Sequence, residues 1–298
     1  MTDLSRLIAE RLAGPGCAAI PFEDAGNPDR ALTLEAYRAP SFGPGKPVVF
    51  VQHGMGRNGD EYRDFWIPAA DRHGLLILAV TYGAEAWPMP ETYNNGLVFD
   101  EAGAVRPREA WGYAVLPRVF AAARDAGLIV GETAHLFGHS AGAQFVHRML
   151  ATCGAGPFAP VISGNAGWYT LPDLDRAFPE GLGGLGLGEA ALRGFLATPL
   201  TILAGSADTE TSGPSLPSHA AALAQGPHRF ARAHAFLEAG RAAAKRLGTD
   251  CAWRLVVADG IGHDGAAMSR MAAGLWFDGL DAAEAAAKAR EGGLATVL

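Results

Sequence analysis

Short runs of consecutive apolar residues alternate along this chain with longer stretches in which apolar residues recur at helical spacing. Continuous apolar runs are typical of strands buried on both faces, and the 3.6-residue period is typical of helices packed on one side. We expect strands at residues 47–52, 75–80, 135–137, 160–163, 200–204 and 254–258. We expect helices at residues 60–73, 108–126, 140–152, 230–247 and 266–290. Strands joined by such helices predict βαβ crossovers and a mainly parallel sheet.

The first 40 residues follow a different pattern. An amphipathic helical stretch is followed by the segments AAIPFE and ALTLEAYRA, which predict an antiparallel hairpin at the edge of the sheet. The expected fold class is therefore α/β, with a mainly parallel central sheet flanked by helices and N-terminal antiparallel edge strands. We expect a single domain over residues 1–298, with inserted loops at about 83–107 and 164–198 near the active site, because these stretches are rich in Gly, Pro and aromatics.

Composition narrows the function classes. The 298 residues are 49% hydrophobic, which excludes a disordered chain. The net charge of −7 disfavours nucleic acid and anionic membranes as partners. Every apolar run is far shorter than the roughly 20 residues that span a bilayer. The N-terminal stretch lacks the continuous apolar core of a secretory signal, and three scattered cysteines fit buried free thiols. We therefore expect a cytoplasmic protein; the oligomeric state cannot be inferred.

The strongest local motif is Gly138-His139-Ser140-Ala141-Gly142, which has the form G-x-S-x-G. An expected strand precedes it and an expected helix follows it. A serine on such a sharp turn takes a strained backbone conformation, and the flanking glycines let strand and helix approach closely. This context favours a nucleophilic serine at Ser140 over a simple Gly-Ser turn.

A second glycine-flanked loop, Gln52-His53-Gly54-Met55-Gly56, follows the expected strand at residues 47–52. A serine nucleophile needs two backbone N–H groups directed at the developing oxyanion. One is expected from Ala141, the residue after the serine, and the other from Met55. The alternative is a glycine-rich loop without a catalytic role.

The serine also needs a base and an acid. His263 follows the last expected strand, in a loop at the carboxyl end of the sheet, where open α/β sheets hold their sites. Asp208 follows the expected strand at residues 200–204 in a Gly-Ser turn, and Glu210, Asp259 and Asp264 compete with it for the role of acid. The order Ser140, Asp208, His263 is the nucleophile–acid–base order of one hydrolase architecture.

With these residues in place, nearly the whole chain resembles the α/β-hydrolase superfamily. The segments HGMGRNG, GHSAG, LAGSADT and GIGHD look like the branch that holds bacterial poly(3-hydroxyalkanoate) depolymerases, feruloyl esterases and dienelactone hydrolases. The resemblance implies a serine esterase that forms an acyl-enzyme. Two departures stand out: a long helix lies between Asp208 and His263, and the secretion signal expected of extracellular polymer-degrading members is missing.

Loops after parallel strands line the sites of such proteins. His53, Arg57, Tyr82, Trp168 and Tyr169 are the expected substrate-binding residues. The aromatics would form a pocket wall, or alternatively pin a long loop to the core. Arg57 would bind a substrate carboxylate, or alternatively be a solvated charge.

The expected function is therefore carboxylic ester hydrolysis, by a carboxylesterase or polyester-oligomer esterase that uses no metal or organic cofactor. The expected partner is a small-molecule or oligomeric ester. A peptidase, amidase or acyltransferase using the same triad is the alternative, because the acyl-enzyme is common to all of them. The resemblance favours esters, since peptidases of this fold generally carry a large extra domain. A non-catalytic binding protein is a third class, which predicts the loss of one triad member.

Overall fold

The computed structural model describes residues 3–294, whose strands build an α/β sheet. The strands are β1 (Gly16–Asp24), β2 (Asn27–Arg38), β3 (Val48–Gln52), β4 (Leu76–Thr81), β5 (Ala134–His139), β6 (Phe158–Gly164), β7 (Leu200–Gly205) and β8 (Arg254–Ala258). Their order in the eight-stranded sheet is β1-β2-β4-β3-β5-β6-β7-β8. β2 pairs antiparallel with β1 and β4, whereas β3–β4, β6–β7 and β7–β8 are parallel pairs. The predicted fold class is confirmed, including its antiparallel N-terminal edge.

The chain divides into two compact units, which we describe separately. Unit 1 comprises Met1–Leu136 and Gly156–Ala159, and unit 2 comprises Phe137–Ala155 and Pro160–Leu298. The division falls within β5 and β6. The single-domain organisation expected from the sequence stays a prediction.

In unit 1, short helices accompany β1 to β4. They are α1 (Asp3–Arg11), α2 (Gly59–Asp64), α3 (Ile67–His73), α4 (Met89–Thr92) and α5 (Val115–Asp125). α1 packs on β1 and α5, and α2 packs on β2, β3 and β4. All five residues of β3 are buried, and Phe50 at its centre contacts the rings of Phe120 and Phe158. Burial on both faces explains the continuous apolar runs of the sequence.

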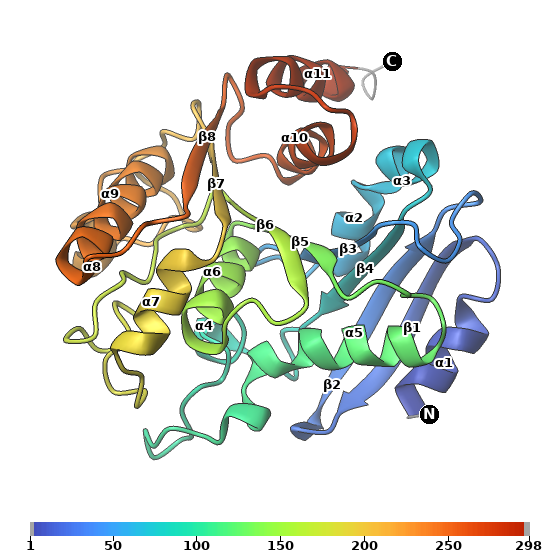
Figure 1. The fold of residues 1–298 in the computed structure, drawn as a ribbon, viewed down its shortest axis with the longest axis horizontal. Coiled ribbons are helices and arrows are strands. Elements are labelled where there is room, and N and C mark those ends of the chain that lie inside the picture. The colour runs from blue at the N-terminus through green and yellow to red at the C-terminus, as the bar shows by residue number, and fades with distance from the viewer. Residues whose placement is uncertain (1–2, 295–298) are drawn as a thin grey trace. The chain divides into compact units, whose positions relative to one another are not determined.

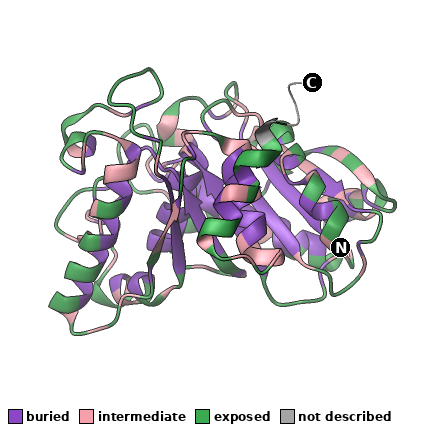
Figure 2. Cartoon of the chain, turned by 90° about the horizontal axis from the view of Figure 1, so that it is seen from above, coloured by how far each residue is buried: buried purple, intermediate pink, exposed green. Residues whose placement is uncertain are grey.

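In unit 2, helices α6 (Ala141–Cys153), α7 (Glu189–Ala197), α8 (Ala220–Leu223), α9 (Arg229–Leu247), α10 (Gly265–Phe277) and α11 (Ala282–Leu294) accompany the later strands. α9 packs on β7, β8 and α7, and α10 packs against α11 (Figure 1). Most strands are buried along their length, whereas helices such as α9 are exposed along one side (Figure 2). Every residue of β7 is buried, so the turn that follows this strand is anchored in the core of unit 2.

Three of the predicted helices are wrong in extent. The stretch 60–73 forms two helices, and Pro68 lies in the first turn of α3, where its missing N–H costs nothing. The stretch 108–126 starts with two 3₁₀ turns, at Arg108–Ala110 and Gly112–Ala114, and α5 begins only at Val115. The stretch 266–290 is interrupted where Gly279 takes a φ of 65°.

The predicted loop at 164–198 is also only partly a loop, because α7 occupies its end. Its glycine-rich part folds tightly on itself: the Leu182 N–H bonds Asp173 O at 2.7 Å, and the Gly183 N–H bonds Arg176 O at 2.7 Å. A Cβ on Gly183 would lie 2.6 Å from Arg176 O, so only glycine fits this turn. Close packing therefore explains why position 183 of this glycine-rich segment is glycine.

The three cysteines are free, as expected, but none of them is buried, so the expectation of buried thiols is wrong. Cys17 and Cys153 are exposed, and Cys251 is partly exposed. Within residues 3–294, no helix is both long enough and apolar enough to cross a membrane.

Candidate active site

Ser140 lies at the junction of β5 and α6, as the motif predicted. β5 ends at His139 and α6 begins at Ala141, so the serine alone makes the turn, with φ 57° and ψ −117°. This conformation is strained for a residue that carries a Cβ. A Cβ on Gly138 would lie 2.3 Å from Gly142 O, so the close approach of strand and helix requires glycine there. The strand–turn–helix context of the motif is confirmed.

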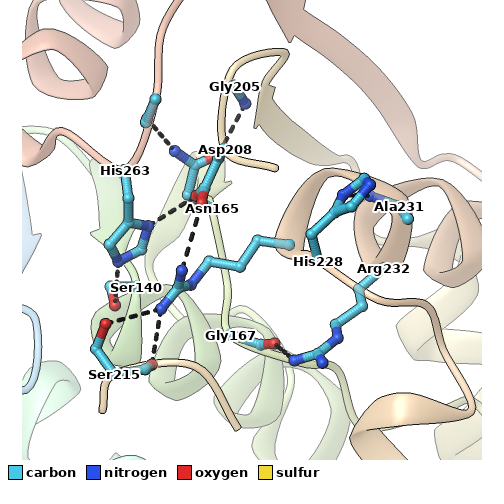
Figure 3. A network of polar contacts seen from close by, with 12 residues as sticks. Ser140, Asn165, Gly167, Gly205, Asp208, Ser215, His228, Ala231, Arg232 and His263 are labelled. Carbon is cyan, nitrogen blue, oxygen red and sulfur yellow. Dashed lines mark hydrogen bonds and ion pairs between the residues drawn. The ribbon is translucent and has the colours of Figure 1, made fainter. Parts of the chain in front are cut away.

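The structure brings the three predicted triad residues together, all within unit 2 (Figure 3). The distance from Ser140 Oγ to His263 Nε2 is 3.0 Å, although the residues are 123 positions apart. His263 Nδ1 lies 2.7 Å from Asp208 Oδ2. A carboxylate can only accept, so Nδ1 donates to it and Nε2 is left to accept the serine O–H. This is the tautomer in which the imidazole can take a proton from the hydroxyl.

Asp208 is the acid that the geometry selects from the four candidates. Its side chain is 1% exposed, and its other oxygen, Oδ1, accepts from Arg229 Nη1 at 3.3 Å. Asp264 instead caps α10 by accepting the Ala267 N–H at 3.0 Å. Asp259 accepts from Ser206 Oγ at 3.2 Å. Glu210 is exposed.

Comparisons with known proteins find hydrolases that are similar to this chain. The chain is 52% identical to "LpqC, poly(3-hydroxybutyrate) depolymerase from Bordetella parapertussis", with a TM-score of 0.92, over 96% of this chain and 98% of that one. It is 38% identical to poly(aspartic acid) hydrolase-1 from Sphingomonas sp. KT-1, with a TM-score of 0.84, over 88% and 98% of the two chains. No protein-family model and no curated protein matches.

The chain belongs to the α/β-hydrolase family that contains LpqC. A more distant likeness, to an S-formylglutathione hydrolase from Agrobacterium tumefaciens, shows the shared fold at 16% identity and a TM-score of 0.56, over 87% and 92% of the two chains. The serine hydrolase class expected from the motifs is confirmed.

In this α/β-hydrolase, the expected base His263 lies beside a second histidine. The ring centroids of His139 and His263 are 4.8 Å apart. His139 is buried, and burial lowers its pKa well below the ordinary value, with His263 and Arg229 adding repulsion. A neutral ring therefore packs against His263, which is itself 24% exposed and so open on another side.

The two expected oxyanion donors belong to different units. Ala141 is the first residue of α6, where the N–H groups of a helix have no intrahelical partner. Met55 lies in the turn after β3, in which the Arg57 N–H bonds Gly54 O at 3.3 Å, and it is 45% exposed. The oxyanion role of each stays a prediction.

Among the expected substrate-binding residues, His53, Arg57 and Tyr82 form a cluster in unit 1, in which Arg57 is partly exposed. His53 Nδ1 bonds Gly54 O at 2.8 Å, and its Nε2 accepts the Tyr82 N–H at 3.1 Å. Arg57 donates to Tyr82 O at 2.9 Å and lies over the Tyr93 ring at 4.3 Å. His53 and Tyr82 have no exposed surface. These contacts give all three a structural role, and substrate contact stays a prediction.

Trp168 and Tyr169 hold the start of the long insertion to the core of unit 2. The Arg148 guanidinium lies 4.8 Å from the Trp168 ring, and Tyr169 stacks on Phe236 at 4.4 Å. Gln225 bonds both the N–H and the O of Tyr169, at 2.8 and 2.7 Å. The contacts fit the interpretation that these aromatics pin the loop; binding of a substrate by either stays a prediction.

Sequence reasoning gave no role to Arg229, the partner of Asp208. It begins α9, 21 residues after Asp208, and the sequence carries no motif that joins the two. The pair is seen only in the structure, where the two buried side chains contact each other.

Proposed function

We propose that this protein is a serine esterase in which Ser140, His263 and Asp208 cleave carboxylic esters through an acyl-enzyme. The observation that carries the proposal is the continuous hydrogen-bond chain from Ser140 Oγ through the His263 ring to Asp208, with distances of 3.0 and 2.7 Å. A serine hydroxyl is a weak nucleophile unless a base is placed in this way.

In the proposed cycle, Ser140 Oγ attacks the acyl carbon while His263 Nε2 takes its proton. The negative charge on the carbonyl oxygen is stabilised by backbone N–H groups, for which Ala141 and Met55 are the candidates. The alcohol leaves with the proton from His263, and the acyl group stays on Ser140. Water then gives its proton to His263 and attacks the acyl carbon, which releases the acid and restores the hydroxyl of Ser140. Asp208 stabilises the imidazolium in both steps.

The proposed substrates are oligomers or small esters of hydroxy acids, because the 52% identical relative is described as a poly(3-hydroxybutyrate) depolymerase. The alternative is amide hydrolysis, favoured by the 38% identity to a poly(aspartic acid) hydrolase. Charge supports the ester: this chain has a net charge of −7, and a polyanion such as poly(aspartic acid) would be repelled. A neutral polyester carries no such penalty.

We also propose a cytoplasmic location and no nucleic-acid or membrane partner. The free state of all three cysteines fits a reducing compartment. Fractionation of the producing cells would test the location.

The function is tested by labelling with a fluorophosphonate, followed by rates on matched p-nitrophenyl esters and p-nitroanilides of one acyl group. We expect labelling that Ser140→Ala abolishes, and ester rates well above anilide rates. An unlabelled native protein would refute the serine hydrolase mechanism. Comparison of 3-hydroxybutyrate oligomers with aspartate oligomers then decides between the two substrate classes, and faster cleavage of aspartate oligomers would overturn the ester proposal.

A further inference from the structure

The end of β6 lies against the turn that carries the nucleophile. Gly164, the last residue of β6, accepts the backbone N–H of Ser140 at 3.0 Å. This backbone bond ties the strained turn to the end of β6. A Cβ on Gly164 would lie 3.5 Å from Gly138 O, so the two backbones are in close contact.

The next residue, Asn165, joins the two loops that carry the acid and the base (Figure 3). Its Oδ1 accepts the Gly205 N–H at 2.7 Å, at the start of the turn that ends in Asp208. Its Nδ2 donates to Gly262 O at 2.9 Å, on the residue directly before His263. The orientation of the amide is fixed, because a backbone N–H can only donate and a carbonyl can only accept.

Asn165 is itself held in one conformation. It is 2% exposed, and its backbone N–H bonds Leu203 O at 2.9 Å. Its φ is 49°, in the left-handed region, which asparagine adopts more readily than other residues that carry a Cβ. Because backbone and amide are both anchored, Asn165 acts as a rigid spacer between the two loops.

The loops that carry Asp208 and His263 also bond each other directly, and this contact fixes the distance between the two loops. The Ala207 N–H bonds Ile261 O at 3.1 Å, and a Cβ on Gly205 would lie 2.4 Å from the same oxygen. The direct bond does not use the Gly205 N–H or Gly262 O, and both of these groups bond the Asn165 amide instead. The 2.7 Å bond between Asp208 and His263 therefore depends on loops that are tied together at several points.

We propose that Asn165 is a positioning residue that sets the distance between Asp208 and His263. Its side-chain bonds go to the loops that carry the acid and the base, and it acts through these loops. The inference rests on the proposed function, since it takes these two residues to be the acid and base of the triad.

Two variants of Asn165 test the proposal. Asn165→Gly tolerates the left-handed backbone and removes both side-chain bonds. Asn165→Asp keeps the acceptor for the Gly205 N–H but replaces the donor to Gly262 O with a carboxylate oxygen, so that two acceptors face each other. We expect kcat to fall by about 10- to 100-fold in Asn165→Gly with little change in KM, because small displacements of catalytic groups reduce the chemical step. We expect kcat to fall in Asn165→Asp as well, because its carboxylate repels Gly262 O and separates the loop of His263 from Asn165.

The second readout is the proton that His263 Nδ1 shares with Asp208, whose ¹H NMR resonance lies far downfield when the bond is short. We expect this resonance to move upfield or broaden away in Asn165→Gly. A purely structural role would lower stability without changing this signal in the folded protein. If Asn165→Gly does not fold, the same two measurements on Asn165→Asp decide the proposal.

The matched control is Asn27→Gly, which removes a similarly buried amide in unit 1. Asn27 is 1% exposed, donates to Asp24 at 3.1 Å and accepts from Arg106 at 3.0 Å. We expect it to lower stability but leave kcat and the resonance unchanged. The proposal is overturned if Asn165→Gly keeps native kcat and the native resonance, or if Asn27→Gly changes both as much. If the native protein is not labelled by a fluorophosphonate, the proposed function fails, and the resonance still tests the positioning role.

Discussion

Arg229 and Asp208 form an ion pair in which both side chains are 1% exposed, with 3.3 Å between Arg229 Nη1 and Asp208 Oδ1. Arg229 also donates to Ser215 O at 2.7 Å, which fixes its guanidinium. Since Asp208 holds His263 with Oδ2 and Arg229 with Oδ1, its carboxylate cannot rotate without breaking one of the two bonds. The pair therefore orients the acid of the triad.

Arg229→Met would leave the Asp208 carboxylate buried without its cation. We expect the free energy of unfolding to fall by about 3 kcal/mol or more, because breaking a buried pair leaves an uncompensated charge. Urea denaturation measures this change, and ester turnover should fall with it.

The control for this variant lies in the same helix. Arg241 pairs with Glu238 at 2.7 Å, but the two side chains are 60% and 67% exposed. Arg241→Met should change the free energy of unfolding by less than about 0.5 kcal/mol, as exposed pairs do. Equal effects of the two variants would mean that the buried pair does not hold Asp208 in place.

Ser140→Gly should stabilise the protein while it abolishes turnover. The φ of 57° and ψ of −117° at Ser140 are strained for serine but open to glycine. Relief of such strain is worth about 1 to 3 kcal/mol, so we expect a higher free energy of unfolding than in Ser140→Ala, which is equally inactive. Thermal unfolding of the two variants measures the difference. Equal stabilities would show that the turn stores no strain.

The sequence was sufficient to predict that Ser140, Asp208 and His263 lie together, because each of them follows a strand. Ser140 directly follows β5, and Asp208 and His263 lie in the turns after β7 and β8. The carboxyl ends of parallel strands meet at one edge of a sheet. The mainly parallel sheet and its antiparallel N-terminal edge follow from the apolar pattern of the same kind of segment. These features depend on local pattern, which a single sequence contains.

Long-range polar contacts could not be predicted in this way. Asn165 bonds Gly262, 97 positions away, through an amide that resembles any loop asparagine in the sequence. The interruption between α10 and α11 has a local cause instead: the Asp281 carboxylate accepts the N–H groups of Ala283 and Glu284 at 2.9 Å and starts a new helix. Helical periodicity continues across such a cap, so the pattern alone predicted one helix.

Lowering the pH should destabilise the protein, because the buried His53 side chain must then take up a proton. Burial lowers the pKa of His53 from its ordinary value of 6.5 to about 4. Below pH 6.5 the unfolded chain takes up this proton before the folded one, so stability is fully present above pH 6.5 and is lost as the pH falls toward 4. Removing the group with His53→Gln should reduce the slope of unfolding free energy against pH by up to about 1.4 kcal/mol per pH unit.

Urea denaturation between pH 6.5 and pH 4 measures this slope. Burial also lowers the pKa of His147, which remains in both proteins and keeps part of the acid sensitivity. His234→Gln, at an exposed position of α9, serves as the control and should leave the slope as it is in the native protein. An unchanged slope in His53→Gln would mean that His53 is not held neutral by burial.

Gly138→Ala tests whether the close approach of β5 and α6 is needed for the nucleophile. Its Cβ would lie 2.3 Å from Gly142 O and 2.8 Å from Val146 Cγ2, so strand and helix must separate. We expect a loss of about 2 kcal/mol or more in the free energy of unfolding, which is typical of overpacking, and a large loss of ester turnover. The control Gly194→Ala lies in α7 with open space around the new methyl group, and it should stabilise the protein by about 0.5 to 1 kcal/mol. If Gly138→Ala retained native turnover and stability, the position of Ser140 could not depend on this contact, and the strained turn alone would have to hold the hydroxyl beside His263.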